Sequence, residues 1–187
     1  MRVPAERSRV PAERSRAATG IMCAVTAKPA AGPLVLRPAT RSDLDTLLEF
    51  RLAMLEAVFP RDTSAPATDA ALLREANERW LGEHLGLDFQ AWMADLDGRT
   101  VASAGLLWFP HPPGPNNPGG LEAYILNVYT LLEARRLGAA RALMELLVDA
   151  AKAAGVRRIW LRASEDGRPL YESMGFRAGN YMELTTR

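Results

Sequence analysis

The chain has 187 residues, of which 48% are hydrophobic and 24% are charged, and its formal net charge is +1. These values are typical of one globular domain with its own core, and they exclude collagen, a disulfide-rich scaffold and a wholly disordered chain. No apolar run approaches the roughly 18 residues of a membrane-spanning helix. A single cysteine, Cys23, excludes an internal disulfide and disfavours a structural zinc site. We therefore expect no metal, no membrane contact and a cytoplasmic location.

The charge is unevenly distributed along the chain. Residues 1–33 carry five Arg, one Lys and two Glu, a net charge of +4, whereas the rest carries 17 basic and 20 acidic side chains, a net charge of −3. Nucleic-acid-binding domains usually carry their basic charge on the folded part. We therefore expect no nucleic-acid partner.

The N-terminal region contains a tandem repeat, because residues 3–9 recur as residues 10–16. It lacks the large apolar side chains that offset the entropy of ordering, so residues 1–33 are expected to be a disordered basic extension. Two alternatives stay open: an extension upstream of a true start at Met22, and a basic tail that binds a polyanion. The folded domain is expected to span residues 34–187.

The first part of the domain is predicted to contain one strand followed by two helices. Thr40 is a good N-cap, and Asp43 stands where a capping box has its acid. Leucines at helical spacing follow until a proline interrupts the pattern. The predicted elements are a strand at 34–37, a helix from 41 to about 59, and a helix that begins after Thr68 or Asp69.

A meander of three strands is predicted next. Asp97-Gly98 between two apolar runs is a strong signal for a tight hairpin. Eight of the 11 residues at 110–120 are Pro or Gly, which indicates a loop. The predicted strands lie at 88–96, 100–109 and 124–130.

The longest predicted helix follows, from Gly138 to Ala154, and Gly155 is its expected C-terminal stop. Its predicted core stripe comprises Leu143, Leu146, Leu147, Ala150 and Ala154. The remaining predicted elements are a strand at 158–163, a short helix from Pro169 to Gly175, and closing strands at Phe176 and 181–185.

This order of elements predicts an α+β (mixed α/β) layer fold with a largely antiparallel sheet. One β-helix-β crossover is expected across residues 124–163. A doubly wound dinucleotide fold does not match, because its strands and helices alternate from the start.

The loop before the longest helix carries the clearest chemical signal. A helix N-terminus presents free backbone N–H groups and about half a positive charge. Gly138, Ala139 and Ala140 let a ligand approach those groups, and Arg135 and Arg136 add charged donors. The pattern favours an anion site suited to a pyrophosphate. Two alternatives stay open: a helix start packed closely on a strand beside two solvated arginines, and a nucleotide-phosphate binder.

Three segments together resemble the GNAT superfamily of N-acetyltransferases: Asn127-Val-Tyr-Thr130, Arg135-Arg-Leu-Gly-Ala-Ala140 and Leu170-Tyr-Glu-Ser-Met-Gly-Phe176. The resemblance implies a central, mostly antiparallel sheet of 6–7 strands flanked by about four helices, with the fourth and fifth strands splayed apart. It also implies transfer of an acetyl group from acetyl-CoA to an amine by direct attack in a ternary complex.

The resemblance assigns roles to individual residues. Val128 and Thr130 would pair through their backbone with the pantetheine arm, and Ser164 would touch the cofactor. Tyr171 would be the general acid that protonates the leaving thiolate. The pyrophosphate would bind at Arg135, Arg136, Leu137, Gly138, Ala139 and Ala140.

The chain departs from the family pattern most clearly at the general base, because residues 125–130 contain no carboxylate. Glu122, His111, Glu83 and His84 are the alternatives, unless water or an amine of low pKa removes the need for a base. A non-catalytic acyl-CoA-binding or regulatory module therefore stays open.

The acceptor is expected to be an amine-bearing small molecule or peptide. The mild negative charge of the domain slightly favours a cationic one. The family resemblance also allows a homodimer.

Overall fold

The computed structural model describes residues 32–58 and 69–184. The predictions for the tandem repeat, Met22, the helix end near residue 59 and a cap at Thr68 lie outside these residues. The elements are β1 (Val35–Pro38), η1 (Arg41–Asp43), α1 (Leu44–Val58), α2 (Ala70–His84), β2 (Phe89–Leu96), β3 (Arg99–Pro110), β4 (Leu121–Thr130), η2 (Leu132–Ala134), α3 (Ala139–Ala153), β5 (Ile159–Leu161) and α4 (Arg168–Ser173).

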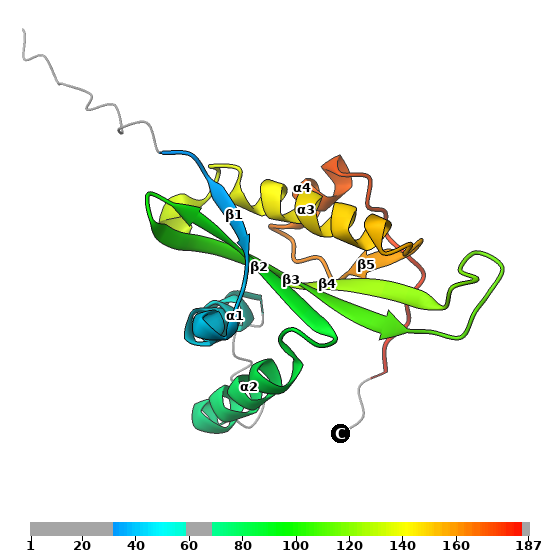
Figure 1. The fold of residues 1–187 in the computed structure, drawn as a ribbon, viewed down its shortest axis with the longest axis horizontal. Helices are drawn as coiled ribbons and strands as arrows, with labels where there is room; N and C mark the ends of the chain where they lie inside the picture. The colour runs from blue at the N-terminus through cyan, green and yellow to red at the C-terminus, as the bar shows by residue number, and fades with distance from the viewer. Residues whose placement is uncertain (1–31, 59–68, 185–187) are drawn as a thin grey trace, which may run out of the picture. The chain divides into compact units, whose positions relative to one another are not determined.

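The five strands form one sheet in the order β1-β2-β3-β4-β5. The first four pair antiparallel, and β5 pairs parallel to β4 after the crossover through α3. Helices α1 and α2 lie on one side of the sheet, and α3 and α4 lie on the other (Figure 1). The predicted mixed α+β class, the largely antiparallel sheet and the crossover are confirmed.

The predicted number of strands, 6–7, is wrong for the described residues, because neither Phe176 nor residues 181–184 form a strand. Gly175, with φ 91°, and Gly179 interrupt this region, and glycine is a poor strand former. Side chains nevertheless connect the tail to β5: the rings of Tyr181 and Trp160 stack with centroids 5.6 Å apart.

Three local signals in the sequence are confirmed. The Asp43 carboxylate accepts hydrogen bonds from the Thr40 backbone N–H at 2.8 Å and from its hydroxyl at 3.0 Å. Asp97 and Gly98 both have positive φ, 52° and 76°, as the tight turn between β2 and β3 requires. Asp69 caps α2, because its side chain accepts from Ala71 N at 2.8 Å.

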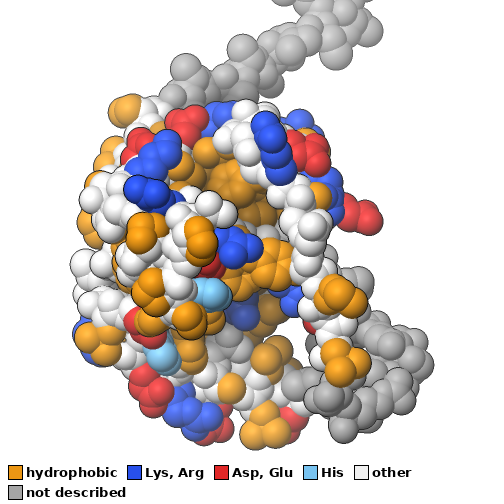
Figure 2. Space-filling view, turned by 90° about the vertical axis from the view of Figure 1, so that its right-hand side faces the viewer, with side chains coloured by type: hydrophobic (Ala, Val, Ile, Leu, Met, Phe, Trp, Pro, Cys, Tyr) orange, Lys and Arg blue, Asp and Glu red, His pale blue; other side chains and the backbone are white. Residues whose placement is uncertain are grey.

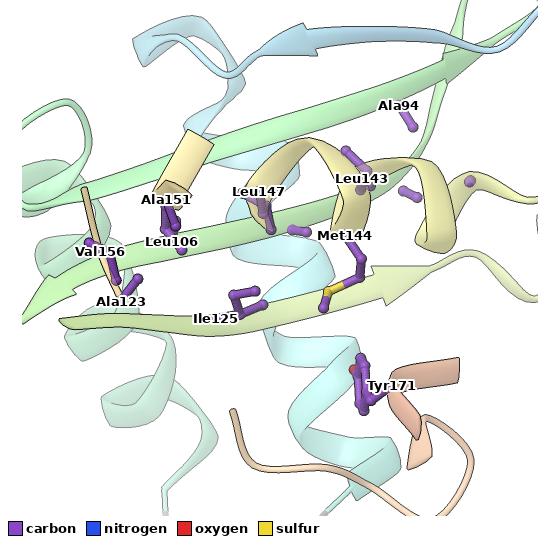
Figure 3. Close-up of a cluster of buried hydrophobic side chains, with 13 residues drawn as sticks. Ala94, Leu106, Ala123, Ile125, Leu143, Met144, Leu147, Ala151, Val156 and Tyr171 are labelled. Carbon is purple, nitrogen blue, oxygen red and sulfur yellow. The ribbon is translucent and has the colours of Figure 1, made fainter. Parts of the chain in front are cut away.

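Each side of the sheet has its own hydrophobic core. The core on the α3 side combines α3 residues with β3, β4 and Tyr171 of α4 (Figure 3). The core on the α1 side centres on Leu47, Leu81 and Phe89. The predicted core stripe of α3 is confirmed in part: Leu143 and Leu147 are buried, Leu146 and Ala150 are half-buried, and Ala154 is exposed. The stripe is completed by Met144 and Ala151.

Within the described residues, no helix is both long enough and apolar enough to cross a membrane.

Candidate active site at the β4 bulge and the α3 N-terminus

Strand β4 has a bulge near its C-terminal end. Ser103 of β3 faces Tyr129 and Gly105 faces Leu126, so two β4 residues, Asn127 and Val128, oppose the single residue between them. Asn127 has φ 55°, a left-handed conformation that asparagine tolerates better than most residues. A bulge disrupts the hydrogen-bond ladder and leaves backbone groups free for other partners. The bulge was not predicted from the sequence, because a single asparagine does not specify where two strands shift register.

Strands β4 and β5 separate just before this bulge. Their pairing covers only Ala123–Ile125 against Ile159–Leu161, whereas β4 continues to Thr130. The predicted splay of the fourth and fifth strands is therefore confirmed. The second half of β4, which includes Val128, has no β5 partner in the described part of the chain.

The loop from Arg135 to Gly138 leads from β4 into α3 and is exposed. Arg136 and Gly138 have positive φ, 66° and 88°, which shapes the turn into the helix. Gly138 is the N-cap and provides no side-chain cap, so no described side chain occupies the first N–H groups of α3. The Arg135 Nε donates to Thr130 O at 3.4 Å and fixes the loop on the end of β4. Ala139 is buried and Ala140 half-buried, which leaves the helix start without bulky side chains.

Tyr171 projects from α4 into the core on the α3 side, where Figure 3 shows it reaching toward Met144. Its side chain is buried, and burial raises the pKa of its hydroxyl above the ordinary value of 10.0. The hydroxyl is therefore protonated at neutral pH. Val128 packs against the same core, so the bulge and Tyr171 belong to one cluster.

Ser164 and Tyr171 meet at Gly167. The Gly167 N–H donates to Ser164 Oγ at 3.2 Å. A Cβ at Gly167 would lie 2.8 Å from Tyr171 Cε2, 3.1 Å from its hydroxyl oxygen and 3.1 Å from Ser164 Oγ. The structure thus brings together two residues that the sequence placed on separate elements, and a glycine makes the approach feasible.

None of the four candidates for a general base lies in the bulge. Glu122 is buried and pairs with Arg158 at 3.3 Å, and Val128 lies six positions further along the strand, about 20 Å away. His84 Nδ1 contacts Asp88 Oδ1 at 2.7 Å, and His111 Nδ1 contacts Pro112 O at 3.1 Å. Glu83 is exposed on α2.

A polar cluster that the sequence did not predict lies on the α1 face of the bulge. Arg51 of α1 donates from Nη1 to Asn127 Oδ1 at 2.7 Å and from Nε to Asn77 Oδ1 at 3.2 Å. Phe50 and Tyr129 pack beside it with ring centroids 5.3 Å apart. Arg51 sits in an otherwise leucine-rich helical pattern, so only a cation on a largely apolar helix would have pointed to it.

Hydrophobic side chains also gather in a hollow on the side of the molecule that carries the 110–120 loop, with charged side chains around it (Figure 2). Trp160 of β5 is the centre of an aromatic cluster in which Tyr124, Phe109 and Tyr181 lie with ring centroids 4.3, 6.1 and 5.6 Å away. Among the described residues, no group of three or more His, Cys, Asp or Glu could hold a metal ion.

Solved structures show the same architecture. A predicted acetyltransferase from Clostridium acetobutylicum, crystallised with acetyl-CoA, is 27% identical with a TM-score of 0.73 over 82% of this chain and 96% of its own. A GCN5-related N-acetyltransferase from Ralstonia eutropha JMP134 is 26% identical with a TM-score of 0.74 over 82% of this chain and 99% of its own.

A ribosomal-protein-alanine N-acetyltransferase from Brucella melitensis biovar Abortus 2308 is 20% identical with a TM-score of 0.61, over 83% of this chain and 99% of its own, and shares the fold. A search of curated proteins finds no match. The model of the acetyltransferase (GNAT) family matches residues 52–176, which is more than half of the sequence. The fold, the splayed strands and this match together show that the chain belongs to the acetyltransferase (GNAT) family.

Proposed function

We propose that the protein transfers an acetyl group from acetyl-CoA to the amine of a small molecule or peptide. The observation that carries the proposal is the N-terminus of α3, which has no side-chain cap, together with the half of β4 that β5 leaves without a partner among the described residues. The α3 N-terminus suits a diphosphate, and the half of β4 without a β5 partner suits an extended chain of amides. CoA contains a diphosphate and such a chain.

The residues present fit such a ligand. The N–H groups at Leu137, Gly138, Ala139 and Ala140 would donate to the pyrophosphate, with the guanidinium groups of Arg135 and Arg136 nearby. The backbone of Val128 and Thr130 would hydrogen-bond the pantetheine amides as an added strand does. Ser164 would contact the same ligand from the opposite side, beside Gly167.

Acetyl-CoA, when bound, supplies a thioester whose carbonyl carbon accepts the amine. The backbone N–H near Val128, in the disrupted ladder of the bulge, would donate to the carbonyl oxygen as negative charge develops on it. Such a donor is fixed by the strand before the reaction begins, so little reorganisation is needed.

Tyr171 would supply the proton that the departing sulfur requires. A general acid must carry its proton at the working pH, and the Tyr171 hydroxyl does so at neutral pH, since burial raises its pKa above an ordinary value that already lies well above 7. The Tyr171 ring and the Val128 side chain belong to one cluster, which supports an acid near the oxyanion donor proposed at the bulge.

No carboxylate among the described residues is placed to deprotonate the amine at the bulge. We therefore propose that the amine reaches the thioester already neutral, or loses a first proton through water. The proton that the nitrogen releases after the attack would return, directly or through water, to the Tyr171 oxygen that has protonated the sulfur. The rate would then rise with pH until most of the free amine is unprotonated.

The experiment is an acetyl-transfer assay with acetyl-CoA and a panel of amino acids, short peptides, polyamines and aminoglycosides, in which the products are identified by mass spectrometry. We expect an acetylated amine and one equivalent of free CoA for each turnover. CoA binding with neither amine acetylation nor thioester hydrolysis would favour the non-catalytic acyl-CoA-binding module instead.

A further inference from the structure

Arg51 is a cation whose described hydrogen-bond partners are all neutral. They are the side-chain oxygens of Asn127, at 2.7 Å, and Asn77, at 3.2 Å. Asn77 is oriented by a bond from its Nδ2 to Leu73 O at 2.8 Å, so its oxygen is held toward Arg51. Within residues 32–58 and 69–184, no carboxylate forms an ion pair with Arg51.

Arg37 shows how the same chain neutralises a cation that has a structural role. Its guanidinium binds Asp43 at 2.8 Å and Asp95 at 2.7 Å, and these hydrogen bonds raise its pKa above the ordinary value. Burial instead lowers the pKa of Arg51. A half-buried guanidinium bonded only to amides keeps most of its attraction for an anion, because amides do not neutralise its charge.

The position of Arg51 relates it to the candidate active site. Asn127, its closest partner, is one of the two bulge residues of β4, and its side chain points toward α1. The neighbouring residue Val128 packs into the core on the opposite side of the sheet, with Tyr171. Arg51 therefore lies beside the bulge, on the face opposite the one that α3 and α4 cover.

Tyr124 lies on the same face of the sheet, where the charges of two arginines act on its hydroxyl. It is half-buried, and burial raises the pKa of its hydroxyl, while the charges of Arg162 and Arg51 act in the opposite direction. Arg162 already has a carboxylate partner, since its Nη2 lies 2.8 Å from Glu183 Oε2. Of these two cations, Arg51 is the one without a described carboxylate.

We propose that Arg51 binds a carboxylate of the acceptor. The acceptor is therefore an amino acid or a short peptide with a free carboxylate. The inference rests on the proposed acetyl transfer, which places the reacting amine at the bulge. It reverses the preference for a cationic acceptor that the net charge of the domain suggests. The bonds to Asn77 and Asn127 use one N–H at Nε and one at Nη1. Of the five N–H groups of a guanidinium, one on Nη1 and those on Nη2 have no partner among the described residues, and this pair of nitrogens can donate two hydrogen bonds to a carboxylate.

The first test compares two acceptors that differ only in the carboxylate. We expect the full-length protein to acetylate glycylglycine with a kcat/KM roughly 10- to 100-fold above that for glycylglycinamide, the range of one charged hydrogen-bonded contact. Arg51→Gln should remove this preference by lowering kcat/KM for glycylglycine alone. Arg51→Lys should retain part of it, because the charge remains but the fork is lost.

Arg74→Gln is the matched control. Arg74 is an exposed arginine of α2 that pairs with the exposed Glu49 at 2.8 Å, so its loss should leave the preference unchanged. Each variant should also bind CoA like the wild type, which shows that it is folded. Equal kcat/KM for the two peptides in the wild type, or a preference unaffected by Arg51→Gln, would overturn the inference while acetyl transfer stands.

A second test does not depend on catalysis. At constant ionic strength, glutarate should raise the melting temperature of the wild type more than neutral glutaramide does, and Arg51→Gln should abolish the difference. If no amine is acetylated, the proposed function fails, and this measurement decides the anion site alone. A glutarate effect that persists in Arg51→Gln would contradict the assignment.

Discussion

At the scale of single residues, the account depends on Tyr171 and the groups that fix it. The ring lies against Gly167 closely enough that a Cβ there would meet it at 2.8 Å. Its hydroxyl is protonated at neutral pH, as a general acid requires, and burial raises its pKa further. Removal of the hydroxyl and displacement of the ring are therefore separate tests.

Tyr171→Phe should lower kcat roughly 100-fold or more, the usual contribution of a general acid, and should leave CoA affinity almost unchanged. Steady-state kinetics and calorimetry measure the two quantities. Tyr181→Phe is the matched control, because the Tyr181 hydroxyl bonds Arg158 at 2.6 Å on the β5 side. Unchanged turnover in Tyr171→Phe would remove Tyr171 from the mechanism.

Gly167→Ala should lower turnover roughly 10- to 100-fold by displacing the Tyr171 ring and Ser164. Its φ of −81° suits alanine, so any effect arises from crowding rather than backbone strain. Overpacking should also cost about 1–3 kcal/mol of unfolding free energy. Gly82→Ala is the control, since nothing lies within 4 Å of its Cβ position. Wild-type kinetics in Gly167→Ala would show that the position of the ring does not matter.

At the scale of elements, the N-terminus of α3 has no side-chain cap. A negative charge added there should therefore raise the stability of the helix and lower its affinity for an anionic ligand. Ala140→Asp places a carboxylate in the first turn, where the helix dipole stabilises it by about 0.3–1 kcal/mol. The same charge repels a pyrophosphate, so CoA affinity should fall roughly tenfold. Ala153→Asp, at the other end of the helix, should lower stability and leave affinity unchanged. Denaturant unfolding and calorimetry provide both numbers, and unaltered affinity in Ala140→Asp would place the ligand elsewhere.

The start of α1 has a pH-dependent anchor. The hydrogen bond from Arg37 lowers the pKa of Asp43 from 3.8 to about 2, so this group stabilises the fold above pH 3.8 and loses the effect as pH falls toward 2. Asp43→Asn should lower the unfolding free energy by about 1–2 kcal/mol at pH 7 and flatten its decline in acid. Urea unfolding at several pH values measures this. Asp149→Asn, an exposed carboxylate 3.7 Å from Lys152, should have almost no effect. Equal losses in both variants would contradict the anchor.

At the scale of the whole molecule, the sequence predicted what local chemistry determines. The Asp97-Gly98 turn, the Thr40–Asp43 cap and the glycine that opens α3 depend on residues close in the chain, and all three have the expected conformation. The register slip at Asn127 depends on how β3 and β4 align, so no local pattern specifies it.

The interactions of Arg51 were unpredictable for the same reason. They join α1 to Asn77 of α2 and to Asn127, which are 26 and 76 residues away in the chain. The closing strands are missing from the described residues for a different reason, because Gly175 and Gly179 interrupt a segment that otherwise contains apolar residues. Tertiary context therefore decides the contacts of Arg51, whereas local glycines oppose the closing strands.

The most direct test of the central claim is a calorimetric titration of the full-length protein with CoA and, separately, with ATP. The account predicts one CoA site of micromolar affinity, and ATP at least about tenfold weaker, because ATP lacks the pantetheine arm that β4 would bind. No binding of CoA at near-millimolar concentration, or equal affinity for the two ligands, would contradict it.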